Sequence, residues 1–184
     1  TKVWTSGLDE GIRQMNNSLS LLKRKKIDLM QIHNLVDWKT HLKTLRTWKD
    51  QGKIQYIGIT HYTESAYPAL EEVIRNHPLD FLQINYSILS RKAEERLFPL
   101  AQEKKVGVII NQPFEEGTLF RMVKGLELPS WAEEFDCHSW GQFFLKFILS
   151  HEAITCVIPG TSKPQHMIDN AGAGFGKLPS SAHR

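Results

Sequence analysis

The sequence is poor in cysteine and contains no long apolar run. Its two cysteines, Cys137 and Cys156, form no CxxC pair. Two isolated thiols in a chain of this size are typical of a reduced, cytoplasmic protein rather than a disulfide-stapled secreted one. No apolar stretch approaches the roughly 20 residues that cross a membrane, and the first residues lack a signal-peptide core. We therefore expect a cytoplasmic chain with no membrane partner.

Clusters of metal ligands and an excess of charge are also missing. His41 and His138 stand alone in the sequence, so we expect both on the surface, and we predict no metal site. Lysine and arginine number 23 against 20 acidic residues, which gives a net charge of +3. This balance is unlike that of a dedicated nucleic-acid-binding protein. With 41% apolar and 23% charged residues, the composition instead predicts a folded globular chain.

Six short apolar runs recur along the chain, and the middle four begin at nearly even intervals, at residues 27, 54, 79 and 106. Such runs are typical of strands buried on both faces of a parallel sheet. The predicted strands cover residues 2–5, 27–33, 54–61, 79–86, 106–111 and 154–158. Between them, apolar residues at three- and four-residue steps indicate amphipathic helices. The predicted helices cover residues 8–26, 38–51, 64–76, 91–105, 138–150 and 164–170.

Alternating strands and helices predict right-handed βαβ units, which build either an open doubly wound sheet or a (β/α)8 barrel. A dinucleotide-binding doubly wound sheet carries a GxGxxG motif after its first strand, and this sequence contains none. The even spacing therefore favours the barrel. We predict an α/β fold in which residues 1–184 form a single partial (β/α)8 TIM barrel domain, with about six of the eight units.

Polar side chains stand at the carboxyl ends of four predicted strands. In chain order these are His33, then Thr60 with His61, then Gln83 with Tyr86, and then Asn111 with Gln112. A barrel gathers these strand ends on one rim, where active sites lie. A histidine at such an end can present a neutral nitrogen to a carbonyl group. Lys2, in the first strand, is either a charge that lowers the pKa of a neighbouring phenol or a frayed chain end.

The last predicted strand runs into residues 158–164, which combine a glycine turn, two hydroxyl side chains, a lysine and a helix start. Backbone N–H groups at a helix N-terminus bind anions, and phosphate sites recur after the last strands of barrels. Thr161, Ser162 and Lys163 are therefore candidate phosphate contacts. Alternatively, Thr161 or Ser162 simply caps the helix. The irregular connection 112–137 is either a functional lid or a family-specific decoration.

These segments, in this order, resemble the aldo-keto reductase family over nearly the whole chain. Residues 1–4 (TKVW) resemble the segment that carries the family's catalytic lysine, and residues 18–33 resemble its SL..L…DL..IH signature. Residues 52–59 (GKIQYIGI) resemble its GKIR.IGvSN stretch, and residues 158–170 resemble its C-terminal cofactor signature. The PGT sequence at 159–161 is more similar to that of the bacterial and channel-β-subunit-like branches of the family than to that of the aldose reductases.

The resemblance implies hydride transfer between the nicotinamide of NADPH and an aldehyde or ketone. The family uses a tetrad of Asp, Tyr, Lys and His, in which the Tyr protonates the carbonyl oxygen and the His orients the carbonyl. Lys2 matches the family lysine and His33 matches the histidine. The Asp and Tyr would precede Thr1, and neither Tyr62 nor Tyr86 matches the family tyrosine. We therefore expect an incomplete barrel, a fragment without turnover of its own.

The resemblance also implies positions that bind NADP(H). They are Thr60, His61, Gln83 and Asn111 near the nicotinamide, and Gly160, Thr161, Ser162, His166, Asp169 and Asn170 near the adenosine phosphate. Thr60-His61 replaces a Ser-Asn pair, and Asn111 replaces an aromatic residue that stacks on nicotinamide, a role that Phe114 could take over. His166 replaces a frequent Arg or Gln. Because Arg is the better phosphate partner, this last change leaves NAD open as a cofactor.

Three functions are compatible with these residues. The first is an NADP(H)-dependent reductase of small carbonyl compounds. The second is a non-catalytic, nicotinamide-cofactor-binding regulatory subunit resembling the channel β-subunits, which the departures at His61 and Asn111 favour. The third is an unrelated barrel that binds a sugar phosphate and has no affinity for nicotinamide.

Overall fold

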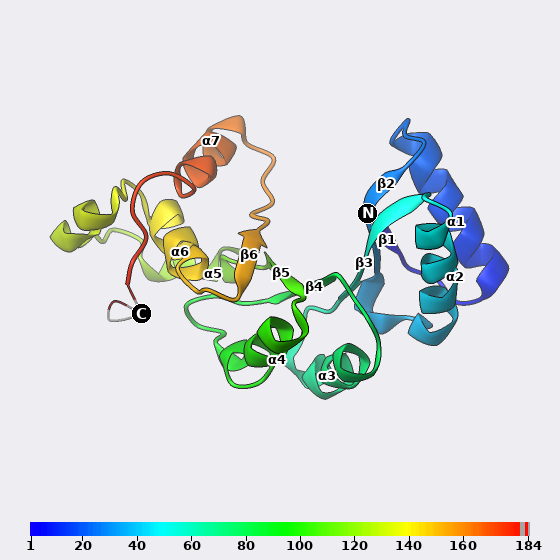
Figure 1. The fold of residues 1–184 in the computed structure, drawn as a ribbon. Helices are drawn as coiled ribbons and strands as arrows, with labels where there is room; N and C mark the ends of the chain where they lie inside the picture. The colour runs from blue at the N-terminus through cyan, green and yellow to red at the C-terminus, as the bar shows by residue number, and fades with distance from the viewer. Residues whose placement is uncertain (181–182, 184) are drawn as a thin grey trace. The chain divides into compact units, whose positions relative to one another are not determined.

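The computed structural model describes residues 1–180 and 183, and strands and helices alternate along this chain (Figure 1). The strands are β1 (Lys2–Val3), β2 (Ile27–Ile32), β3 (Ile54–Thr60), β4 (Phe81–Asn85), β5 (Gly107–Asn111) and β6 (Ile154–Val157). The α-helices are α1 (Leu8–Leu21), α2 (Trp38–Asp50), α3 (Tyr67–Asn76), α4 (Leu97–Lys104), α5 (Thr118–Met122), α6 (Trp140–Leu149) and α7 (Pro164–Gly172). Short 3-10 turns are η1 (His33–Leu35), η2 (Glu64–Ala66), η3 (Lys92–Glu94), η4 (Glu115–Gly117) and η5 (Ser130–Phe135).

The six strands are parallel, and their order in the sheet is their order in the chain. This arrangement confirms the predicted fold class, a partial (β/α)8 barrel. In the register of neighbouring strands, Lys2 is opposite Gln31, Gln31 is opposite Gly58, and Thr60 is opposite Gln83. These pairs place the predicted site residues of β1 to β4 near the same end of their strands.

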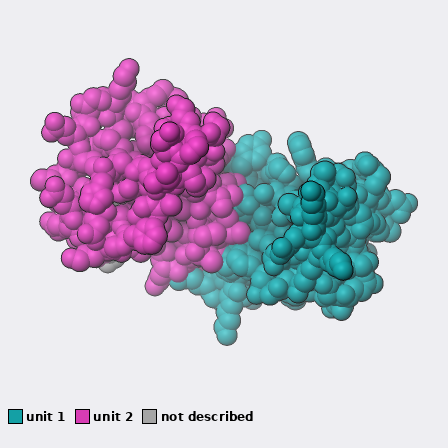
Figure 2. Space-filling view, turned by 90° about the horizontal axis from the view of Figure 1, so that it is seen from above, with its two compact units in different colours: residues 1–84, 100–107 teal, residues 85–99, 108–184 magenta. Residues whose placement is uncertain are grey.

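The chain divides into two compact units, which Figure 2 shows in different colours. Unit 1 contains residues 1–84 and 100–107, and unit 2 contains residues 85–99 and 108–184. In unit 1, α2 packs on β2 and β3, and α1 packs on α2 and β1. In unit 2, α6 packs on β6 and α7. None of the helices in the described part of the chain is long and apolar enough to cross a membrane.

The core of unit 1 corrects two expectations. His41 lies fully buried rather than on the surface, with its Nε2 2.7 Å from the carbonyl oxygen of Thr5. Gly11 of α1 makes this burial feasible, because a Cβ there would lie 2.4 Å from Cε1 of His41. Helix α1 ends at Leu21 instead of residue 26, and Lys23 then adopts a left-handed backbone with φ 52°. The basic run 23–26 thus forms the turn into β2. His138 is exposed, as expected.

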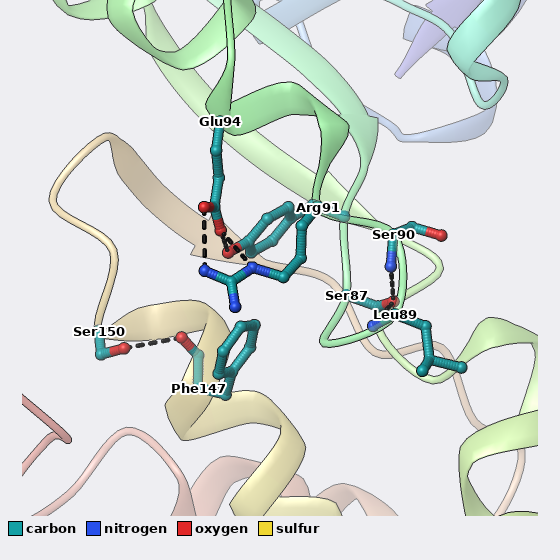
Figure 3. A network of polar contacts seen from close by, with 8 residues as sticks. Ser87, Leu89, Ser90, Arg91, Glu94, Phe147 and Ser150 are labelled. Atoms are coloured by element: carbon teal, nitrogen blue, oxygen red, sulfur yellow. Dashed lines mark hydrogen bonds and ion pairs between the residues drawn. The ribbon is translucent and has the colours of Figure 1, made fainter. Parts of the chain in front are cut away.

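The core of unit 2 contains an aromatic cluster around Tyr86. The ring of Tyr86 is fully buried and lies 5.0 Å from Phe98 and 6.1 Å from Phe147 between centroids. Its hydroxyl donates to Glu94, and Glu94 also accepts from Arg91. The Arg91 guanidinium then covers the ring of Phe147 at 5.3 Å (Figure 3). Tyr86 is therefore a buried structural residue of this unit.

Candidate functional site

The polar strand ends of unit 1 lie together, as the sequence predicts. His33 directly follows β2, and Thr60 is the buried last residue of β3, whose hydroxyl oxygen accepts from the backbone N–H of Asn34 at 3.3 Å. His61 follows Thr60, and its backbone N–H donates to the carbonyl oxygen of Gln83 at 3.0 Å. The sheet thus brings Lys2, His33, Thr60, His61 and Gln83 to one region of unit 1.

Burial and charge favour the neutral form of His33. Its pKa is lowered from 6.5, first by burial and then by the positive charge of Lys2. The ring of Trp4 lies 5.1 Å from the His33 ring and contributes to this partly apolar surrounding. At neutral pH the imidazole therefore carries one N–H donor and one acceptor nitrogen, which is the form that can orient a carbonyl group.

His61 is held by its own loop. Its Nδ1 accepts from the backbone N–H of Thr63 at 3.2 Å, and its ring stacks on Tyr62 with centroids 5.6 Å apart. The pKa of His61 is lowered from 6.5, first by burial and then by the charge of His33. The stacking on Tyr62 is a contact that the amide of the family's Asn would not make.

Unit 2 contains a cavity of about 560 Å³ at the carboxyl ends of β5 and β6. Five of the predicted cofactor residues line it: Gly160, Thr161, His166, Asp169 and Asn170. Of the described residues, Ser162 and Asn111 are not part of this lining, although Gln112 is. The structure therefore brings most of the residues predicted to contact the adenosine phosphate together in one cavity of unit 2.

The cavity has features that fit the phosphates of a dinucleotide. An added Cβ at Gly160 would meet no atom within 4 Å, so the backbone there faces open space. Helix α7 begins at Pro164 without a side-chain cap, which argues against the alternative in which Thr161 or Ser162 caps it. The Thr161 hydroxyl oxygen instead accepts from the backbone N–H of Lys163 at 3.2 Å. Uncapped N–H groups at this helix start are suited to an anionic group.

Asp169 has a contact that the sequence did not indicate. Its carboxylate accepts from Oγ of Ser139 at 2.7 Å and from Nε2 of Gln142 at 2.9 Å. Ser139 also caps α6, since its Oγ accepts from the backbone N–H of Gln142. Asp169 therefore fastens α7 to the start of α6, in addition to lining the cavity.

Sequence reasoning missed most of the aromatic wall of this cavity. Phe114, Phe120 and Trp140 line it, together with the carboxylate-bearing Glu116. The rings of Phe114 and Phe120 lie 4.9 Å apart. Phe114 was a candidate, whereas Phe120 was missed because the connection 112–137 has no period from which the facing side chains could be read. The connection contains η4, α5 and η5, and its first part, from Gln112 to Phe120, contributes to the cavity wall.

Comparisons with known proteins identify relatives of this chain in sequence and in fold. An oxidoreductase of Schizosaccharomyces pombe described as uncharacterized, C215.11c, is 26% identical over 166 residues, which are 89% of this chain and 52% of that protein. The chain thus spans about half the length of this curated relative. The aldo-keto reductase AKR11C1 from Bacillus halodurans, in its holo form, has a TM-score of 0.77 and 23% identity, covering 100% of this chain and 68% of its own.

A second solved structure has a similar likeness. The aldo/keto reductase from Klebsiella pneumoniae in complex with NADP and acetate has a TM-score of 0.78 and 17% identity, covering 100% of this chain and 65% of its own. At these identities the likeness establishes the fold. The family itself follows from the model of the aldo/keto reductase family, which matches residues 1–184 and excludes the unrelated sugar-phosphate barrel. This chain belongs to the aldo/keto reductase family.

Proposed function

We propose that the chain is the NADP(H)-binding part of an oxidoreductase that reduces aldehydes or ketones to alcohols. The observation that carries the proposal is the cavity of unit 2, where five family-matched positions meet around an open backbone and an uncapped helix start. The NADP in the Klebsiella pneumoniae structure supports the choice of cofactor. When bound, the nicotinamide supplies the hydride.

In unit 2 we assign the phosphates to the backbone around Gly160 and the N-terminus of α7, with Thr161 as a side-chain contact. His166 and Asn170 lie on the first turns of α7 and take the adenosine end. Phe114 and Trp140 provide apolar walls of the cavity. Ser162 and Asn111 keep their family assignment as a prediction, although neither lines the cavity in this structure.

In unit 1 we assign the carbonyl substrate to His33. A neutral His33 donates a hydrogen bond to the carbonyl oxygen, and burial, together with the positive charge of Lys2, lowers the pKa of the ring and so favours this neutral form. Thr60 and Gln83 offer polar groups for the carboxamide of the cofactor. His61 replaces the family Asn in this role.

We propose further that these 184 residues bind the cofactor without turning over a substrate. The family's proton donor is a tyrosine, and none of the chain's four tyrosines matches it. Tyr67 and Tyr86 are buried, and the hydroxyl of Tyr86 donates a hydrogen bond to Glu94. Loss of a general acid lowers a rate by about 10²–10⁴-fold.

The test is titration of the purified chain with NADPH, followed by the change in nicotinamide fluorescence. We expect saturable binding. Binding should weaken in Gly160→Val, because the Val side chain occupies the open space beside the backbone at this position. Gly125 is an exposed glycine outside the cavity lining, but its φ of +79° would strain a Val at that position. The control is therefore Ala171→Val, at an exposed position. Absence of binding by the unmodified chain would refute the proposal, and measurable turnover of an aldehyde would refute the claim of inactivity.

A second candidate function, the non-catalytic regulatory subunit, is favoured by His61 specifically. Its Nδ1 is engaged by Thr63 and its ring lies on Tyr62, so it does not present the amide that the family uses. The two functions separate in a longer form of the protein that includes the family's Asp and Tyr. Turnover of small aldehydes by that form supports the reductase, and cofactor binding without turnover supports the regulatory subunit.

A further inference from the structure

A second cavity of unit 2 contains a lysine on the apolar face of a helix. Phe143, Lys146 and Phe147 follow one another in α6 at three- and one-residue steps, so they lie on the same face of this helix. All three line a cavity of about 110 Å³, which has no lining residue in common with the proposed cofactor cavity. Only 1% of the Lys146 surface is exposed. A buried ammonium group is costly unless its charge is balanced.

Aromatic rings form much of the wall of this cavity. Trp131 and Phe135 of η5 line it together with Phe143 and Phe147 of α6. The ring of Trp131 lies 5.5 Å from that of Phe143 and 6.1 Å from that of Phe135 between centroids. An apolar cavity of about 150 Å³ in another protein binds one benzene molecule. The aromatic wall and the volume therefore fit a ligand with a single ring.

The two long cationic side chains of this cavity differ in how their charge is balanced. Arg91 donates from Nε and Nη2 to the two carboxylate oxygens of Glu94, at 3.0 Å each (Figure 3). Lys146 donates from Nζ only to the carbonyl oxygens of Phe175, at 2.5 Å, and Lys177, at 2.9 Å. Among the described residues, no carboxylate lines the cavity. Because an ammonium group has three N–H donors, Lys146 keeps one donor and an unbalanced positive charge for a ligand.

We propose that this cavity binds a small aromatic carboxylate, of the size of benzoate. The ring lies between the side chains of Trp131, Phe143 and Phe147, and the carboxylate accepts from Nζ of Lys146. The ligand supplies the negative charge that the cavity lining lacks, and the rings exclude water from the ion pair, which strengthens it. The site is separate from the proposed cofactor cavity, so its tests use no cofactor.

The first test locates bound benzoate with the indole N–H signals of the 15N-labelled chain. Trp131→Phe identifies the Trp131 signal, and Trp4→Phe identifies that of Trp4, which lies 5.1 Å from the ring of His33 in unit 1. We expect benzoate to move the Trp131 signal with a dissociation constant of about 1 mM or below. The Trp4 signal should stay in place. A Trp131 signal that does not move, or movement of the Trp4 signal alone, overturns the proposal.

The second test compares benzoate with benzamide, which has the same ring and a similar shape but no charge. We expect the unmodified chain to bind benzoate about tenfold more tightly, and Lys146→Met to bind the two equally. Lys124→Met is the control, because Lys124 is exposed and does not line the cavity. A partial loss of folded chain affects both ligands alike, so a ratio that Lys146→Met leaves unchanged contradicts the proposal. If that variant does not fold, equal binding by the unmodified chain contradicts it as well.

The third test fills the cavity without changing its charge. Cys137 lines the cavity and is 3% exposed, so the larger side chain in Cys137→Leu takes up space that the ring needs. We expect benzoate and benzamide both to lose more than about tenfold in affinity. The matched control is Cys156→Leu, since Cys156 does not line this cavity. Unchanged benzoate affinity in a folded Cys137→Leu chain would place the ligand elsewhere and refute the site.

Discussion

Unit 1 places its candidate residues on strand ends, whereas unit 2 places them on loops and at the start of a helix. In unit 1, the parallel register brings Thr60 opposite Gln83, and backbone hydrogen bonds fix His61 beside them. In unit 2, the cavity is lined by the connection 112–137 and by α7, whose position depends on side-chain contacts such as that of Asp169 with Ser139.

The difference indicates that the two units respond to different changes. A site built on a sheet register is sensitive to the charge and hydrogen bonding of its side chains, because the backbone already holds their positions. A site built on loops and helix ends is sensitive to the packing beneath it. Substitutions in the packed core of unit 2, at the hydrogen-bonded Asp169 and at the titrating histidines of unit 1 therefore differ in their expected effects.

The largest effect is expected from the aromatic core of unit 2. Phe98 is fully buried, and its ring meets Tyr86 at 5.0 Å and His151 at 4.7 Å between centroids. Phe98→Ala leaves a cavity that this cluster cannot refill, so we expect a loss of about 3–5 kcal/mol in the free energy of unfolding. Urea denaturation followed by tryptophan fluorescence measures it.

The control for this change is Phe175→Ala, because 74% of the Phe175 surface is exposed. We expect that variant to stay within about 0.5 kcal/mol of the unmodified chain. Equal losses for the two phenylalanines would mean that packing does not support unit 2 in the way we describe.

An intermediate effect is expected at Asp169. The family resemblance assigns it to the cofactor, whereas the structure shows it accepting from Ser139 and Gln142. Asp169→Ala leaves two partly buried donors without their acceptor, and we expect a loss of about 1–3 kcal/mol in unfolding free energy. The exposed Asp50→Ala is the control. A chain that keeps its stability but loses NADPH affinity would instead make Asp169 a ligand and not an anchor.

The sequence predicted unit 1 better than unit 2 for a physical reason. A strand buried on both faces needs a continuous apolar run, so 27–33 was recognisable as the strand that the structure places at Ile27–Ile32. Parallel strands share their direction, so the meeting of His33, Thr60 and Gln83 follows from their positions at strand ends. No such rule applies to the connection 112–137, where Gln112, Glu115 and Glu116 adopt left-handed backbone conformations and the cavity wall has no period.

Errors in unit 1 arose where a contact came from another element. His41 was expected on the surface because it stands alone in the sequence, and its burial depends on the missing side chain of Gly11. Gln31 was hidden for a similar reason. The contact of this buried glutamine could not be predicted from its own strand. It depends on Gln83, which lies two strands away, and on Gly58, which lies on the strand between them.

The smallest effect is expected from the titration of unit 1. The pKa values of His33 and His61 are both lowered from 6.5, with burial as the first cause. The unfolded chain therefore takes up protons at a higher pH than the folded chain does. The stability contributed by the neutral forms of these two histidines is present well above pH 6.5 and is lost as the pH drops from there toward their folded-state pKa values. The lowered pKa values of the carboxyls Glu10 and Asp37 act at a more acidic pH, outside this window.

We expect urea midpoints to decrease between about pH 7.5 and about pH 5.5, and to decrease less in His61→Asn, whose amide does not titrate. The exposed His138→Asn of unit 2 serves as the control and should follow the unmodified chain. If His61→Asn and the unmodified chain lose the same stability over this interval, then burial does not set the charge state of the strand-end histidines. In that case unit 1 is not sensitive to the charge of its side chains, and the contrast with the packing-sensitive unit 2 does not hold.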